Sequence, residues 1–400
     1  MLFNIPRNLW VLLTAQAFGS CGTIMVIFIG GVVGAVMAPT EDLATAPVTA
    51  VILGVALSTV PAALLMRRTG RRAGFMIGCV LAIIGAGLGA YAIAIENFWF
   101  FVAAMLPIGT NQAFVQQYRF AAIESVPASD APKAVSTVLL GSIGAALLGP
   151  TIGSHASTLI PDAIYAGSFL ALCICYLVAM TILTQLRVPE LQNAPQVKTV
   201  APRSLLRILA SPRALTAVSG AAIGFGVMTL LMTATPLTMH VHRQFSMLDT
   251  GTVIQAHVMA MFLPSLFTGK LVTKYGETAM LSVGIAVNFI AIGIALHGDS
   301  WSHFVLALTA LGLGWNLLFI TSTTLLAKSY AANERHAVQA ANDFSVFGFQ
   351  ATASLSAGFL ISAIGWEYLA LCAAIPLALL AVLVIIRHFA DRPHADSATA

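Results

Sequence analysis

The sequence predicts an all-α polytopic membrane protein, with twelve transmembrane helices arranged as two pseudo-symmetric six-helix halves. Two observations carry this fold class. Hydrophobic residues make up 58% of the 400 positions and charged residues only 8%, and the mean hydropathy of +0.91 lies far above that of soluble globular chains. In addition, the apolar residues form runs of about 20 residues or more, the length needed to cross the hydrocarbon core of a bilayer.

Six apolar runs come before the longest polar stretch of the chain. The first run, from Leu9 to about Val36, greatly exceeds the apolar part of a signal peptide, which is roughly 7–15 residues long. It is therefore expected to be the first span. The six expected spans cover residues 9–36, 45–66, 74–95, 98–118, 134–159 and 163–186.

Six further runs follow, at residues 213–238, 250–271, 278–297, 302–327, 341–363 and 366–387. The stretch before them is rich in proline and in basic residues, as linkers between domains often are. The sequence therefore predicts an N-terminal bundle at 1–186, a cytoplasmic linker at 187–212, a C-terminal bundle at 213–390 and a polar cytoplasmic tail at 391–400.

An internal repeat supports the division into halves. The segments "ALLMRRTGRR", after the second span, and "GKLVTKYGE", after the eighth, align at an offset of 206 residues, which pairs Gly70 with Gly276. Duplicated helical units of this kind are a common transporter architecture.

The basic residues give the expected orientation. With a cytoplasmic N-terminus, every Lys and Arg of the 19 in the chain except Arg243 lies on the cytoplasmic side or at a span end facing it. This satisfies the positive-inside rule and places both termini in the cytoplasm, in a bacterial inner membrane. The formal net charge of +4 then reflects orientation signals, so nucleic acid is not an expected partner.

Twelve spans in two halves, with "RRTGRR" between the second and third spans, resemble the major facilitator superfamily over essentially the whole chain. The resemblance implies a secondary transporter. The loop departs from the superfamily pattern at two positions, because Ala63 replaces the first glycine and Arg67 stands where an acidic residue is expected. The segment "LLGPTIG", Leu147 to Gly153, is similar in part to an element of superfamily antiporters, which favours export somewhat.

Polar side chains inside the membrane are expensive and usually face a cavity or another helix. Span 11 carries Asp343, which is the only carboxylate within an expected span apart from Glu367 at the outer edge of span 12. Either helix contacts or a substrate cavity and ion coupling would explain such residues. The other members of this set are Asn111, Gln112, Gln116, Tyr118 and Arg119 in span 4, and Trp315 and Asn316 in span 10.

Two four-residue spacings in spans 7 and 8 stand out. Met228 and Met232 share one helix face, as do His257 and Met261. Counted from the outer ends of their spans, Met232 and His257 lie at depths of about 9 and 10 Å, and Met228 and Met261 at about 15 and 16 Å. If the two helices are neighbours with these faces turned together, three thioethers and one imidazole converge.

Neutral sulfur and nitrogen ligands favour Cu(I) among common metals, and burying them costs far less than burying carboxylates. Pro236 and Pro264 each remove a backbone donor beside the proposed ligands, which is expected to bend both helices. At the outer end of span 7, Met239, His240 and His242 form either an entry station for the metal or an ordinary exposed loop. Plain packing of methionine remains the alternative for the central residues.

The two motifs together, in these two spans, resemble the CcoA-like copper importers of bacteria, a branch of the major facilitator superfamily. The resemblance implies metal binding by Met228, Met232, His257 and Met261, and copper supply for haem-copper oxidase assembly. Other members of the same branch transport riboflavin, so the resemblance narrows the cargo to a short list.

The leading interpretation is copper import by alternating access, with copper as the cargo and no resident cofactor. Riboflavin or another small molecule is the alternative cargo, and efflux of a drug or metabolite is a third possibility. From another class, the chain could be a membrane assembly factor that transports nothing. An enzyme is not expected, because no nucleophile, base and orienting residue form a recognisable set. The protein is expected to act as a monomer in the lipid bilayer.

Overall fold

The computed structural model describes residues 6–127, 131–187, 203–331 and 334–391, and every regular element within them is a helix. The N-terminal half begins with a broken first span, in which the π-helix η1 (Val26–Gly30) follows α1 (Arg7–Gly19) and α2 (Cys21–Met25) and precedes α3 (Gly31–Met37). Its other helices are α4 (Ala46–Thr69), α5 (Arg71–Ala94), α6 (Phe98–Val115), α7 (Tyr118–Glu124), α8 (Ala131–Leu139), α9 (Gly141–His155) and α10 (Ala166–Leu183).

The C-terminal half begins with the short helix α11 (Leu205–Leu209). Its first span is α12 (Pro212–Pro236), which continues into the π-helix η4 (Leu237–His242). The next span is α13 (Met247–Phe262) followed by α14 (Ser265–Tyr275), and the two are bent by 42° at their junction. The remaining helices are α15 (Glu277–His297), α16 (Trp301–Ala327), α17 (Arg335–Cys372) and α18 (Ala374–Asp391).

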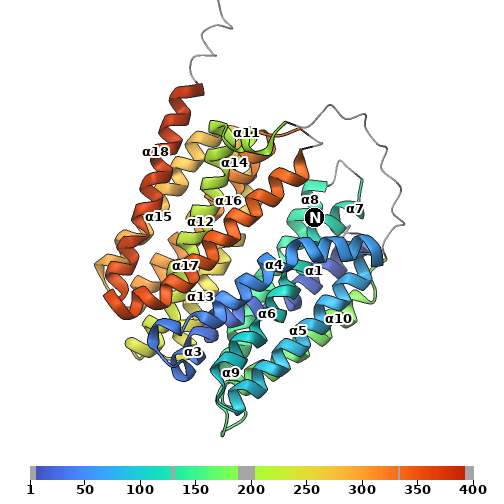
Figure 1. Cartoon of the computed structure of the whole chain (residues 1–400), viewed down its shortest axis with the longest axis vertical. Coiled ribbons are helices and arrows are strands. Elements are labelled where there is room, and N and C mark those ends of the chain that lie inside the picture. The colour runs from blue at the N-terminus through green and yellow to red at the C-terminus, as the bar shows by residue number, and fades with distance from the viewer. Residues whose placement is uncertain (1–5, 128–130, 188–202, 332–333, 392–400) are drawn as a thin grey trace, which may run out of the picture.

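The twelve predicted spans are confirmed when two parts of the C-terminal half are counted as follows. The bent pair α13–α14 is one span, and the long apolar stretch that ends the described chain is two. The apolar stretch Ala337–Phe389 contains 53 residues, which at 1.5 Å per residue would be about 80 Å long, far more than one crossing of a bilayer needs. It is divided at Gly365, whose φ of 77° and ψ of 177° break the helix, and α18 runs back toward the opposite end of the bundle (Figure 1), where it packs against α12 and α15.

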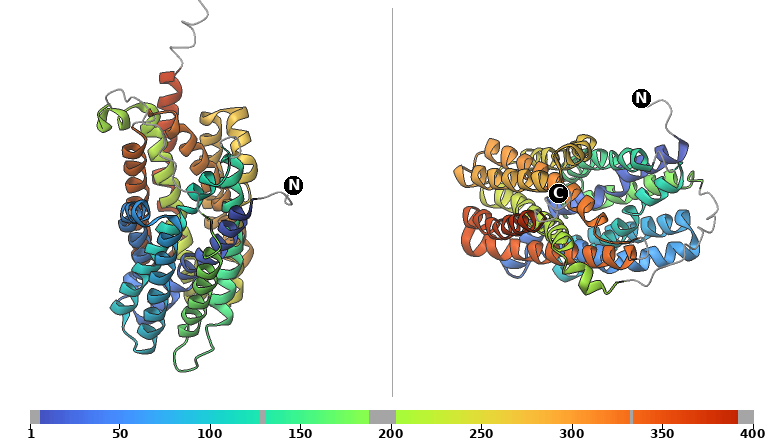
Figure 2. Two further views of the ribbon diagram at one scale, coloured as in Figure 1. Left: turned by 90° about the vertical axis from the view of Figure 1, so that its right-hand side faces the viewer. Right: turned by 90° about the horizontal axis from the view of Figure 1, so that it is seen from above.

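The two halves lie side by side, with the helices before residue 187 on one side and those after 203 on the other (Figure 2). The predicted domain boundaries remain a prediction. Most of the predicted linker, residues 188–202, and nearly all of the predicted tail, residues 392–400, lie outside the described residues.

Equivalent turns in the two halves show the internal repeat directly. Gly70 has φ 85° and ψ 159°, and Gly276 has φ 82° and ψ 160°. Both adopt a conformation that glycine tolerates far better than other residues. The residue after each glycine forms an ion pair with the end of a neighbouring span, but with opposite polarity: Arg71 with Glu124, at 2.7 Å, and Glu277 with Lys328.

Hydrogen bonds between the halves, among the described residues, gather toward one end of the bundle, opposite α11, which the predicted orientation makes the outer end. Thr49 of α4 and Ser354 of α17 share a hydrogen bond of 3.0 Å. Gln255 of α13 donates to the Leu147 carbonyl and to Thr151 Oγ1 of α9, both at 3.1 Å. The structure is therefore closed at the end opposite α11, through neutral hydrogen bonds and side-chain packing.

At the opposite end, Arg203 forms an ion pair and hydrogen bonds with Glu334 of the C-terminal half. Its guanidinium donates to both oxygens of Glu334, at 2.8 and 2.7 Å, and its backbone N–H donates to the same carboxylate at 2.9 Å. A fourth donor is the backbone N–H of Ala331. Because these donors favour the ionised form, they lower the pKa of Glu334 to about 2, although its side chain is only 4% exposed.

This contact predicts a pH-dependent stability. A carboxyl group whose pKa falls from 4.5 to about 2 on folding stabilises the protein fully above pH 4.5 and loses that contribution as the pH falls toward 2. We expect Glu334→Gln to lower the Tm of the purified protein at pH 7, and the difference from wild type to shrink below pH 4.5. Glu41→Gln, at an exposed position, is the control. A Tm difference that is constant down to pH 3 would contradict the assignment.

Candidate functional site

His257 lies fully buried on α13, against α16. Its Nδ1 is 2.7 Å from the Leu308 carbonyl. Since a carbonyl can only accept, Nδ1 carries the proton and Nε2 of the neutral ring keeps its lone pair. No described residue bonds to Nε2. A backbone carbonyl that fixes the tautomer while leaving the other nitrogen free is the usual support of a liganding histidine.

The three methionines predicted to join His257 are also buried, with Met228, Met232 and Met261 exposed by 5%, 3% and 7%. Their convergence was predicted on the condition that spans 7 and 8 are neighbours, and this condition is not met along most of the two spans. Helix α16 packs along both α12 and α13, which contact each other little. The convergence of the four side chains therefore stays a prediction. Within the described ranges, no three His, Cys, Asp or Glu side chains lie together to hold a metal, so such a site would depend on thioethers.

The predicted entry station lies on η4, directly after Pro236. Met239 is completely buried, and His240 Nδ1 lies 2.8 Å from the Phe245 carbonyl, where it closes the turn to α13. His242 is the last residue of the π-helix. A π-helix widens the hydrogen-bonded ring of the backbone and is often found at functional sites. Entry of a metal here stays a prediction, although the segment is more structured than a loop.

Asn316 of α16 holds the bend of span 8. Its amide nitrogen donates to the Met261 carbonyl at 2.7 Å and to Ser265 Oγ at 2.6 Å, and its oxygen accepts from Thr268 Oγ1 at 2.6 Å. Pro264 cannot donate to the carbonyl four residues before it, so the helix is already weakened there. The completely buried amide of Asn316 thus replaces helical hydrogen bonds at the break.

Trp315, the neighbour of Asn316 in sequence, joins three helices through aromatic contacts. Its ring centroid lies 5.0 Å from Phe225 of α12, 6.0 Å from Phe262 of α13 and 5.0 Å from Phe319 of its own helix. The indole is 4% exposed, and its N–H donates to no described residue. An unpaired buried donor costs about 1–3 kcal/mol, so this N–H is a candidate contact for a ligand.

Two hydroxyls of α12 are also buried without a hydrogen-bond partner among the described residues, and no sequence pattern pointed to them. Thr229 and Thr233 are 4% and 1% exposed, and neither Oγ1 has a hydrogen-bond partner among the described residues. Other buried threonines on the same helix bond to the carbonyl four residues earlier, as Thr235 does to Leu231 at 2.7 Å. The sequence alone cannot predict which hydroxyls of a span lack a partner, because this depends on how the helices pack.

The polar candidates of span 4 differ in how far they are buried: Asn111 and Tyr118 are buried, whereas Gln112 and Gln116 are only half-buried. Asn111 is buried and donates to the Gly19 carbonyl at 3.1 Å, at the first break of span 1. Tyr118 is also buried and packs edge-on against Phe75, with ring centroids 4.6 Å apart. These contacts join helices, and Asn111 Oδ1 and the Tyr118 hydroxyl have no hydrogen-bond partner among the described residues. Gln112 and Gln116 are half-buried, and Gln116 follows the last residue of α6.

Arg119 and Asp343 belong to different halves of the protein. Arg119 stacks over the Phe120 ring at 4.9 Å, and its charge acts on the half-buried Asp343 carboxylate of α17. Asp343 also accepts a hydrogen bond of 3.2 Å from Asn342. The structure thus places this predicted carboxylate at the boundary between the halves, where relative motion of the halves would alter its surroundings.

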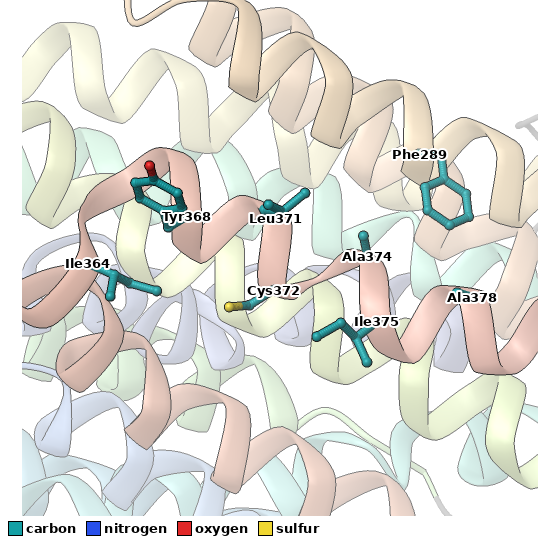
Figure 3. A pocket seen from close by; sticks show the side chains of 8 residues that line it. All are labelled: Phe289, Ile364, Tyr368, Leu371, Cys372, Ala374, Ile375 and Ala378. Atoms are coloured by element: carbon teal, nitrogen blue, oxygen red, sulfur yellow. The ribbon is translucent and has the colours of Figure 1, made fainter.

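An apolar hollow of about 530 Å³ lies away from all these residues, between α15 and the turn that joins α17 to α18. Figure 3 shows Phe289, Tyr368, Cys372 and Ile375 among the side chains that line it. Phe289, Tyr368 and Ile375 are exposed on the outside of the bundle. The hollow therefore faces the hydrocarbon of the membrane and is no part of the candidate site.

Comparison with known proteins agrees with this architecture. The model of the major facilitator superfamily matches residues 10–348 and 228–400, nearly the whole chain. The chain belongs to the major facilitator superfamily. It is thus a multi-pass membrane protein of a transporter family rather than an enzyme family.

Three relatives match most of the chain. The riboflavin transporter RfnT of Brucella anthropi is 38% identical over 361 residues, which are 90% of each chain. The uncharacterized MFS-type transporter YddS of Bacillus subtilis is 27% identical over 401 residues, which are 96% of this chain and 91% of the relative. YdeG, an uncharacterized MFS-type transporter of the same organism, is 29% identical over 383 residues, or 91% and 87%.

Proposed function

We propose that the protein imports riboflavin across the bacterial inner membrane by alternating access, as a monomer with both termini in the cytoplasm. The observation that carries this proposal is the 38% identity to a riboflavin transporter over 90% of both chains. The aromatic contacts of Trp315 support it, because a flat, fused-ring cargo is best held by aromatic faces. Riboflavin thus takes the place of copper, the cargo that the sequence motifs favoured.

Copper remains a second candidate cargo because of one observation. His257 presents an unpaired Nε2 inside the membrane, and Met261 shares its helix face. Imidazole and thioethers suit Cu(I). In this proposal Met228, Met232, His257 and Met261 bind the ion loosely, and Met239, His240 and His242 receive it first. Neither proposal requires a resident cofactor.

Parallel uptake assays separate the two cargoes. We expect cells that lack their own importers to accumulate radiolabelled riboflavin when they express the wild type, and Trp315→Ala to lower the initial rate about tenfold or more. Trp301→Ala, at the exposed start of the same helix, is the matched control and should retain uptake. Equal riboflavin uptake with and without the protein would refute the proposal.

The same cells report on copper and on the other classes of function. Copper uptake that is lost in the Met228→Ala, His257→Ala double variant would replace riboflavin by copper as the cargo. Riboflavin that binds to the purified protein without uptake would point to an assembly or sensory factor. Accelerated loss of preloaded riboflavin would indicate efflux.

A further inference from the structure

A hollow of about 560 Å³ lies in the N-terminal half, where the turn between α4 and α5 meets the segment that follows α10. It lies at the end of the bundle that the predicted orientation places in the cytoplasm. Its lining includes three basic residues, one hydroxyl and two apolar side chains: Arg71, Arg72, Arg187, Thr69, Met76 and Leu186. Because Trp315 and His257 belong to the other half, this basic hollow is separate from the candidate cargo site.

The positive charge of the basic hollow is only partly neutralised. Arg71 donates to both oxygens of Glu124, at 3.2 Å from Nε and 2.7 Å from Nη2. No described residue forms an ion pair or a hydrogen bond with the guanidinium group of Arg72 or of Arg187. The basic hollow therefore keeps the charge of two arginines that the protein itself does not neutralise.

The backbone beside these arginines adds to the attraction for an anion. Arg71 and Arg72 are the first two residues of α5, and Gly70 before them provides no side chain to cap the helix. The first turn of α5 also contains no acidic residue. Unpaired N–H groups at the start of a helix carry partial positive charge, so they act in the same direction as the guanidinium groups.

The equivalent turn of the C-terminal half shows that the fold does not require arginines here. Gly276 has nearly the same backbone conformation as Gly70. The offset of 206 residues nevertheless pairs the two arginines after Gly70 with Glu277 and Thr278. The basic chemistry is therefore a property of this hollow and not of the repeated turn.

We propose that the basic hollow binds the phosphate of an anionic phospholipid. Guanidinium groups suit phosphate oxygens because they stay charged and donate several hydrogen bonds in one plane. Basic pockets at the cytoplasmic ends of spans are suited to lipid headgroups. Met76 and Leu186 provide an apolar wall for the part of the lipid next to its phosphate, which a free phosphate ion would leave without a partner. Through Arg72 and Arg187, the bound headgroup would link the turn before α5 to the segment after α10.

The first test uses the wild-type protein in detergent, so that folding of a variant is not at issue. The Tm is measured with added phosphatidylglycerol, with phosphatidylcholine of the same acyl chains, and with inorganic phosphate at constant ionic strength. We expect phosphatidylglycerol to raise the Tm more than either of the others, because a ligand that binds the folded state stabilises it. The same Tm with both lipids would overturn the assignment to an anionic lipid. An equal rise with inorganic phosphate would show a free phosphate site instead.

Charge-matched variants test whether the basic hollow is the site. The Arg72→Gln, Arg187→Gln pair removes its two free guanidinium groups, whereas the control pair Arg67→Gln, Arg68→Gln removes two exposed ones of the same turn that do not line it. Arg71 stays unchanged, because its ion pair joins two spans. Binding of fluorescent phosphatidylglycerol to the purified proteins is measured by anisotropy.

We expect the first pair to weaken binding about 30-fold, since each basic residue near an anionic membrane surface contributes a factor of about five. The control pair should weaken it much less. Equal weakening by both pairs would show that the lipid responds to the overall positive charge of the turn, and it would overturn the assignment to the basic hollow. Unchanged binding in the first pair would overturn it as well.

Discussion

Replacing Gly358 by valine should abolish most uptake by trapping the protein with its outer end open. Gly358 lies on α17, and a Cβ atom at this position would stand 2.5 Å from the Asp42 carbonyl and 2.7 Å from Thr45 Oγ1. Both belong to the other half of the protein. A valine side chain therefore clashes with backbone across the boundary that closes the outer end.

The size of the effect follows from the cost of overpacking. Inserting methyl groups into a close-packed contact typically costs about 1–3 kcal/mol, and 1–3 kcal/mol shifts a two-state equilibrium by roughly 5- to 150-fold. Since importing a substrate requires the outer end to close behind it, we expect the initial uptake rate to fall about tenfold or more. Initial rates at saturating riboflavin measure this directly.

Gly348→Val is the matched control, because Gly348 lies on the same helix and a Cβ there would meet no atom within 4 Å. A second readout reports the conformation. Thr49, 7% exposed at the closed boundary, is changed to cysteine and labelled with a membrane-impermeant maleimide. Labelling should be faster with Gly358→Val than with Gly348→Val. Equal uptake and equal labelling in the two backgrounds would show that this contact does not control closure.

The sequence was sufficient for the fold because the membrane limits the choices. A run of about 20 apolar residues can cross a bilayer only as a helix, and the fixed offset between Gly70 and Gly276 reveals the duplication. Even the break at Gly365 agrees with the predicted gap between spans 11 and 12. The arrangement of the helices around one another could not be predicted in this way, because hydropathy carries no information on which helices are neighbours.

That difference explains what could not be predicted at the site. Spans 7 and 8 are consecutive and their residues can be ordered by depth, but α16 packs along both of them. Because α16 packs against both helices, its Trp315 contacts Phe225 of α12 and Phe262 of α13. Depth alone cannot distinguish a side chain that faces a cavity from one that bonds to another helix. The sequence therefore left both roles open for Asn316, and the structure shows its amide bonded to the backbone and side chains of span 8.

Asn316→Leu tests whether the bend of span 8 positions His257 and Met261. The leucine side chain has a similar size but leaves the Met261 carbonyl and the Ser265 hydroxyl without the donor that they now have. Loss of a partner for buried polar groups costs about 1–3 kcal/mol. We expect a lower Tm in detergent, together with a fall in riboflavin uptake of about tenfold or more, because the residues on α13 lose the support that sets their orientation.

Asn288→Leu separates positioning from general damage to the bundle. Asn288 is also a buried asparagine, 1% exposed, but its amide donates within its own helix, to the Gly284 carbonyl at 2.8 Å. It should lower the Tm with a smaller loss of uptake. If both variants lost uptake in proportion to their loss of stability, Asn316 would be a structural residue only. A larger loss for Asn316→Leu at comparable Tm would show that the bend it holds is part of the transport mechanism, because Asn316, unlike Asn288, bonds to the helix that carries His257.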